Sequence, residues 1–87
     1  MRPRRTKDQI VSRILSICEG EGAGKTRIVY ASNLNFQKTK EYLDLLIKNG
    51  LIESEHEDAA LYRTTPRGIE LLKHLKAIEK FIPQLCD

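Results

Sequence analysis

Residues 33–53, NLNFQKTKEYLDLLIKNGLIE, contain a helix together with both of its ends. Asn35 is a favoured N-cap residue, because its side-chain oxygen can accept a hydrogen bond from a free backbone N–H of the first turn. Core-type side chains then recur at steps of three and four residues: Phe36, Thr39, Tyr42, Leu43, Leu46 and Ile47. Asn49-Gly50 is typical of a helix C-terminus, since both residues tolerate a left-handed backbone. The stretch therefore predicts a helix over 35–49.

Two further helices are expected upstream of this one. KTRIVYAS predicts a short helix over 25–32, which the Asn-Leu-Asn stretch separates from the next helix by a tight turn. Thr6 and Gln9 have the spacing of a capping box at the start of a helix over 7–19. Its apolar residues share one broad face: Ile10, Val11, Ile14, Leu15, Ile17 and Cys18. Glycines at 20, 22 and 24 end it.

A hairpin and a last helix follow. LIESE and ALYRT are short strand-compatible segments on either side of the polar residues 56–59, and they predict a two-stranded hairpin. Thr65-Pro66 is typical of a helix start, with Thr as the cap and Pro at the first helical position, where no N–H is needed. We expect this helix to run over 65–82.

The order helix, short helix, turn, helix, hairpin, helix, together with YRTTPRG at 62–68, resembles the archaeal winged helix-turn-helix DNA-binding regulators. That group includes the ten-kilodalton archaeal DNA-binding chromatin proteins, and the resemblance covers residues 7–80. It implies an α+β, mostly α, winged helix-turn-helix fold with a three-helix core, a two-stranded wing and a C-terminal helix. It also implies double-stranded DNA binding by a transcription regulator or chromatin-associated protein.

By this resemblance, the exposed N-terminal part of the helix 35–49 enters the major groove. The residues implied there are Asn35, Gln37, Lys38, Lys40 and Glu41. Gln can pair with the N6/N7 edge of adenine, and Lys can donate to guanine or to phosphate. For Asn35, a purely capping role is the alternative.

Other basic residues are candidates for phosphate contacts. Lys25 and Arg27 lie beside a helix N-terminus, where backbone N–H groups favour anions, and the alternative is that both are simply solvated basic residues. Arg4 and Arg5 belong to a flexible basic arm, residues 1–6, whose alternative reading is a frayed terminus. Arg63 and Arg67 could partly offset the charge of the wing.

The charge distribution leaves two functions open. The net charge is +3, but residues 1–51 carry ten Lys/Arg against five Asp/Glu (+5), whereas residues 52–87 carry five against seven (−2). The basic first half favours DNA. The wing contains four acidic residues, Glu53, Glu55, Glu57 and Asp58, which repel phosphate. An acidic wing favours the alternative, a winged-helix module for protein–protein contacts in transcription or chromatin machinery.

The last helix has a heptad-like apolar seam formed by Leu71, Leu75, Ile78, Ile82 and Leu85. The seam suggests a homodimer through this helix, and the alternative is a small core wrapped around it.

Other classes of function are disfavoured. GEGAGKT at 20–26 has Glu19 where a phosphate-binding P-loop needs Gly, so nucleotide binding is not expected. His56 and His74 form no catalytic set, and Cys18 and Cys86 suggest no zinc site or disulfide framework. We expect a single domain over 1–87 that is not an enzyme, uses no cofactor or metal, spans no membrane, and lies in the cytoplasm with the nucleoid.

Overall fold

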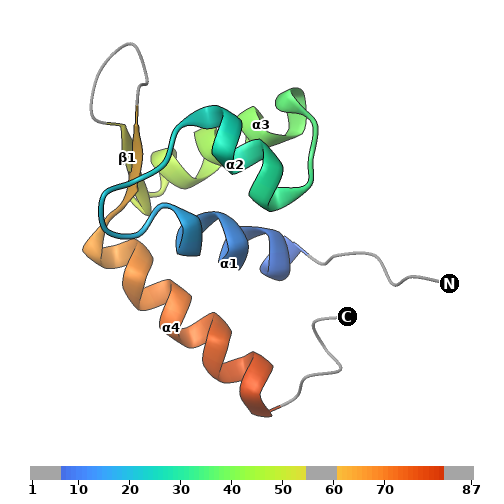
Figure 1. Cartoon of the computed structure of the whole chain (residues 1–87). Helices are drawn as coiled ribbons and strands as arrows, with labels where there is room; N and C mark the ends of the chain where they lie inside the picture. Colours follow the sequence, from blue (N-terminus) through green and yellow to red (C-terminus); the bar gives the residue numbers. More distant parts are fainter. Residues whose placement is uncertain (1–6, 55–60, 82–87) are drawn as a thin grey trace, which may run out of the picture.

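The computed structural model describes residues 7–54 and 61–81. Four helices and two strands follow one another in the order α1, α2, α3, β1, β2, α4 (Figure 1). Their bounds are α1 Lys7–Ile17, α2 Lys25–Ser32, α3 Phe36–Lys48, β1 Ile52–Ser54, β2 Tyr62–Thr64 and α4 Pro66–Phe81. The winged helix-turn-helix fold expected from the sequence is confirmed.

The first helix ends two residues earlier than expected, at Ile17 rather than at residue 19. The chain tightens after Ile17, where the Glu19 N–H donates to the carbonyl of Ser16. Gly20 and Gly22 then take positive φ values of 71° and 91°, which turn the chain away from the helix. Thr6, the first residue of the expected capping box, lies outside the described residues.

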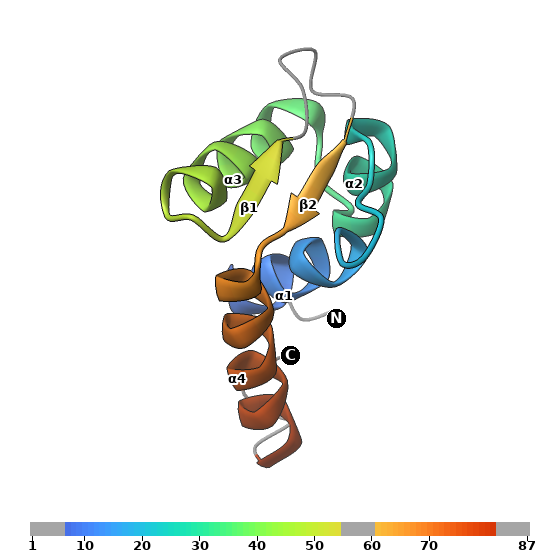
Figure 2. The same ribbon diagram turned by 90° about the vertical axis from the view of Figure 1, so that its left-hand side faces the viewer.

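The core lies where α1, α2 and α3 meet beneath the sheet (Figure 2). Ile14 and Leu15 of α1 are fully buried, as are Ile28 of α2 and Leu43 of α3. Burying one aliphatic side chain of this size stabilises a fold by about 2 kcal/mol. These contacts fix the angle at which α3 crosses the other two helices.

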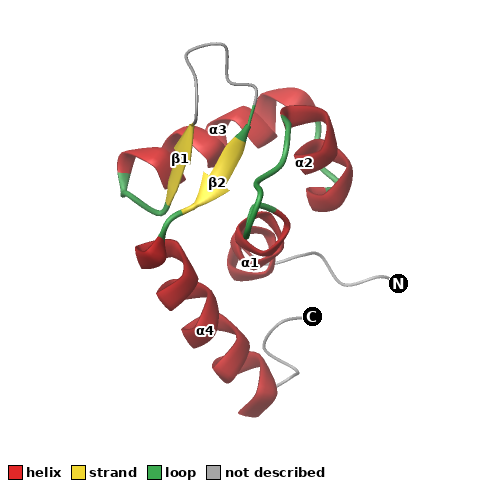
Figure 3. Ribbon diagram, turned by 60° about the vertical axis from the view of Figure 1, so that its left-hand side comes forward, coloured by secondary structure: helices red, strands yellow, loops and turns green. Residues whose placement is uncertain are grey.

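Strand β2 is bonded on both of its edges. It pairs antiparallel with β1 in the register Ile52↔Thr64, as expected for the wing. On its other edge, the N–H groups of Ala23 and Tyr62 each donate to the other residue's carbonyl, at 2.9 and 2.8 Å. Figure 3 shows the loop between α1 and α2 running beside this strand. The acidic tip expected at Glu55, Glu57 and Asp58 lies outside the described residues.

Helix α4 begins with the expected cap. The Thr65 hydroxyl accepts the Gly68 N–H at 3.1 Å and donates to the Gly50 carbonyl at 2.6 Å. The helix then extends away from the core (Figure 1), and its last six described residues, 76–81, are all exposed. Position 82, the expected end, lies outside the described residues. Within 7–54 and 61–81, no helix is long and apolar enough to cross a bilayer.

We predict that Gly68→Ala destabilises the fold by about 3 kcal/mol. Gly68 is buried, and an added Cβ would overlap the Leu51 carbonyl oxygen and lie 2.6 Å from Cγ2 of Thr64. Urea unfolding followed by circular dichroism measures the change. Glu70→Ala, at an exposed position one half-turn further along α4, is the control and should stay within about 0.5 kcal/mol of the wild type. Equal stability of the two variants would contradict the packing described here.

Candidate nucleic-acid interface

Helix α3 buries one face and exposes the opposite one. Thr39, Leu43 and Leu46 are buried against the core. Successive helical residues are about 100° apart, so Gln37, Glu41 and Asp44 point away from that buried face. All three are exposed. Together with Lys48 they form the outer ridge of α3, and this ridge is what a ligand approaching the helix would meet.

Asn35 is the N-cap of α3. Its side-chain oxygen accepts the backbone N–H of Lys38 at 2.7 Å, and its own backbone is extended. One of the four free N–H groups of the first turn is thereby satisfied. The capping role left open by the sequence is therefore the one the structure gives to this side chain.

Lys38 and Lys40 lie on opposite flanks of α3. The two positions are about 200° of helical rotation apart. Lys38 lines a shallow hollow with Lys7 of α1 and with Glu41, Tyr42 and Leu45 of α3. On the other flank, the charges of Lys40 and Asp44 both act on the pKa of Tyr62 in β2, which burial raises above its usual value. One lysine therefore faces the start of α1 and the other faces the wing.

Both lysines are paired with acids of the same helix. Lys38 Nζ lies 3.5 Å from Glu41 Oε1, and Lys40 Nζ lies 3.2 Å from Asp44 Oδ2. Glu41 also accepts from Gln37 Nε2 at 3.3 Å, through its other oxygen. Pairs this exposed contribute about 0.3–0.5 kcal/mol, so an incoming phosphate can displace the acids at little cost.

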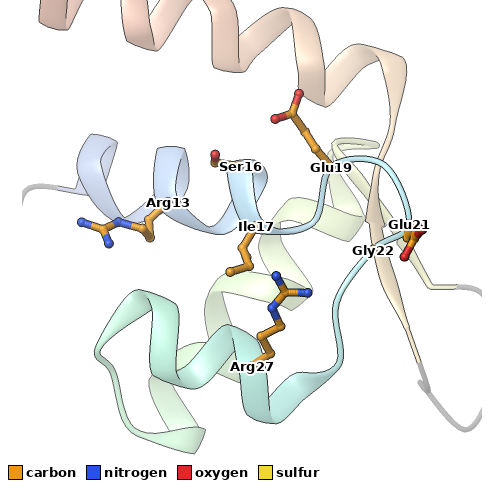
Figure 4. A pocket seen from close by; sticks show the side chains of 7 residues that line it. All are labelled: Arg13, Ser16, Ile17, Glu19, Glu21, Gly22 and Arg27. Carbon is orange, nitrogen blue, oxygen red and sulfur yellow. The ribbon is translucent and has the colours of Figure 1, made fainter.

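The start of α2 has no side-chain cap. Its N-cap, Gly24, has no side chain and makes no side-chain cap hydrogen bond. Lys25 is half-buried there, and Arg27 is exposed. Arg27 and Arg13 line a hollow between α1, the following loop and α2 (Figure 4), in which Arg27 extends towards Ile17. Glu19 and Glu21 of the loop line it too. Arg27 also lowers the pKa of buried Cys18 slightly, although burial dominates and raises that pKa to about 12.

The remaining basic candidates lie elsewhere. Arg63 is half-buried on β2 and faces Glu53 across the ladder, so an opposite charge lies beside it. Arg67 donates through Nε to the Asn49 carbonyl at 3.1 Å, at the C-terminal end of α3. That end is about 20 Å from Asn35, given 1.5 Å per residue. Arg4 and Arg5 lie outside the described residues. DNA contacts by these four arginines stay predictions.

Two side chains at this surface were not singled out from the sequence. Asp44 is four residues after Lys40, a spacing at which opposite charges pair on a helix, and this pattern was available in the sequence. Arg13 lines the same hollow as Arg27 only because α1 and α2 pack together, so no local signal reveals it. Among the described residues, no group of His, Cys, Asp or Glu is placed to hold a metal ion.

A three-helix core with a capped, exposed third helix and a two-stranded wing defines the winged helix-turn-helix class. A family model described as "Winged helix-turn-helix" matches residues 4–82. The chain therefore belongs to the winged helix-turn-helix family.

Two similar proteins come from one archaeon. An uncharacterised protein of Methanocaldococcus jannaschii is 38% identical over 56 residues, which make up 64% of this chain and 58% of the relative. A second uncharacterised protein from that organism is 29% identical over 79 residues, 91% of this chain and 36% of the relative. The chain thus matches less than two thirds of the length of either relative. Among solved structures, the chain is similar to Sso10a-2, a DNA-binding protein from Sulfolobus solfataricus, with 30% sequence identity and a TM-score of 0.80. The match covers 93% of this chain and 85% of the Sso10a-2 chain.

We predict that Asn35→Ala lowers the free energy of unfolding by about 1 kcal/mol, because the cap of α3 is lost. Asn35→Asp keeps an acceptor oxygen at the same place and should restore most of that stability. Thermal and urea unfolding of the three proteins provide the comparison. If the Ala and Asp variants were equally unstable, the hydrogen bond to Lys38 would not be what stabilises this helix start.

Proposed function

We propose that this protein binds double-stranded DNA with the N-terminal half of α3 in the major groove. It would act as a transcription regulator or chromatin-associated protein of the cytoplasm and nucleoid, without catalytic activity. The single observation that carries the proposal is the outer ridge of α3, whose exposed polar side chains start at a capped helix end and have a lysine on each flank.

The dimensions of α3 suit the groove. A helix with its side chains is about 10–12 Å across, and the major groove of B-DNA is about 12 Å wide. With α3 lying in the groove, Lys38 and Lys40 on its opposite flanks would face the two phosphate walls. Gln37 and Glu41 between them would face the base edges.

Phosphate contacts from outside the groove would add affinity. The uncapped N–H groups at the start of α2, with Lys25 and Arg27 beside them, are suited to one phosphate. The basic arm with Arg4 and Arg5 is proposed to follow the backbone or enter a minor groove. The similarity to Sso10a-2, described as a DNA-binding protein, supports the same function here.

We predict that duplex DNA binding falls steeply with salt and that Lys38→Ala and Lys40→Ala each reduce the slope of log K against log salt by about 0.9. Each variant removes one phosphate contact in the proposed arrangement. Deletion of residues 1–5 should reduce the slope further. Fluorescence anisotropy between about 50 and 200 mM salt gives the slopes.

The matched control is Lys73→Ala, which removes an exposed lysine from α4, away from the proposed interface. Its slope should equal that of the wild type. If the wild type binds no duplex even near 50 mM salt, the DNA proposal is wrong, and a search for protein partners takes its place.

We also propose a homodimer through the outer part of α4. Leu71 packs against the core, and Leu75 is half-buried. Ile78 is 47% exposed, although it belongs to the same apolar stripe. A second copy of the helix would cover it, because apolar stripes repeating at steps of three and four residues pair with one another. The last two residues of the seam, Ile82 and Leu85, lie outside the described residues.

We predict that Ile78→Glu shifts sedimentation at tens of micromolar from a dimer to a monomer, because a charge would be buried in the paired stripe. Ala77→Glu places the same charge about a third of a turn away and should leave the dimer intact. A wild-type protein that sediments as a monomer at this concentration would remove the dimer proposal.

One observation favours the rival function, a protein–protein interaction module. Glu41 and Asp44 on α3 and Glu53 on β1 are all exposed, and such acids repel phosphate. The salt titration above separates the two functions, since protein partners do not require a counterion-release slope.

A further inference from the structure

We infer that Glu41 is a specificity-determining residue that accepts a hydrogen bond from the amino group of cytosine in the major groove, next to an adenine read by Gln37. This inference rests on the proposed DNA binding by α3. It assigns the outer ridge a preference for particular base pairs, and it accounts for an acidic side chain at the centre of a surface that faces a polyanion.

Glu41 lies in the middle of the exposed face of α3. It lies on the outer ridge, nearly opposite the buried Thr39 and Leu43, and its side chain is 54% exposed. Lys38 and Lys40 occupy positions on the two flanks of the helix, and each ammonium group is paired there with an acid of the ridge. A carboxylate here therefore meets base edges rather than the phosphate walls.

The chemistry of a carboxylate restricts which bases it can meet. An ionised Glu only accepts hydrogen bonds, and most groups in the major groove are acceptors too. The donors there are the amino groups of cytosine and adenine, and Glu is suited to cytosine N4. Over guanine or thymine the carboxylate would be desolvated without a partner. Each base pair presents one such amino group, on one of its two bases, so Glu41 favours sequences in which cytosine stands at the position it faces and disfavours those with guanine or thymine there.

The contacts in the free protein prepare the pair for this role. Gln37 Nε2 donates to Glu41 Oε2 at 3.3 Å. An amide nitrogen has two hydrogens, so the second remains available for adenine N7 while the first keeps its bond to Glu41. The bond also fixes which end of the amide faces Glu41, leaving its oxygen to accept from adenine N6.

The other carboxylate oxygen of Glu41 is paired with Lys38 and becomes free when DNA binds. Glu41 Oε1 is held by Lys38 Nζ at 3.5 Å in an exposed pair. When Lys38 turns to a phosphate, Oε1 becomes available for cytosine N4. Gln37 and Glu41 are one turn apart, about 6 Å along the axis, and base pairs are about 3.4 Å apart. The adenine and the cytosine should therefore lie within two base steps of each other.

The test selects duplexes from a pool with a randomised central segment, using wild type, Glu41→Gln and Glu70→Gln. The wild type should enrich a cytosine within two steps of an adenine. Titration of the enriched duplex and of its C·G to T·A variant should show about tenfold discrimination. Glu41→Gln should lose this discrimination and bind unrelated DNA more tightly, because a repelling charge is removed.

Glu70→Gln removes one acid from an exposed site on α4 and should keep the wild-type preference. Thermal unfolding checks that each variant is folded. If Glu41→Gln keeps the cytosine preference, or if the wild type binds duplexes with no such preference, the assignment of Glu41 is wrong while DNA binding stands. If the wild type neither enriches nor binds any duplex, the proposed function fails and this inference fails with it.

Discussion

The structure depends on the hydrogen bonds that β2 makes to segments far from it in the sequence. Thr64 donates its N–H to the Cys18 carbonyl at 3.0 Å and its hydroxyl to the Leu15 carbonyl at 2.7 Å. Tyr62 exchanges two backbone bonds with Ala23. The end of α1, the loop before α2 and strand β1 are thus all bonded to one strand of three residues. Because Thr64 is buried, losing its partners would leave polar groups unsatisfied, at about 1–3 kcal/mol each.

Local signals in the sequence predicted the elements well, because each helix start has its own side-chain chemistry. Asn35 and Thr65 cap α3 and α4 through their own oxygens, as their residue types indicate. Long-range pairings were not predictable in this way. The Ala23–Tyr62 pairing and the bond from Arg67 to the Asn49 carbonyl join residues 39 and 18 positions apart, and nothing near either residue specifies the partner. The end of α1 was predicted too late, because the turn after Ile17 overrides the apolar pattern that continues to Cys18.

The same distinction applies to the candidate interface. Sequence and resemblance pointed to the first turns of α3, and the structure shows those side chains exposed on one capped helix. The i,i+3 and i,i+4 spacings of Lys38 with Glu41 and of Lys40 with Asp44 were available in the sequence. What each flank faces was not, because that requires the orientation of α3 relative to α1 and the wing. Charges that are close in the sequence thus form two weak ion pairs, one on each flank of α3, with the outer ridge between them.

The projecting end of α4 has a consequence for local stability. Residues 76–81 have no buried side chain among them, and a helical segment this short is unstable in water unless something packs against it. In a monomer, its backbone hydrogen bonds should open far more often than those around Leu72, which is buried on the core. Protection against amide hydrogen exchange would therefore fall in two steps along α4, from the turns packed on the core to the projecting end. Slow exchange beyond Lys76 would be a direct sign that another surface covers it.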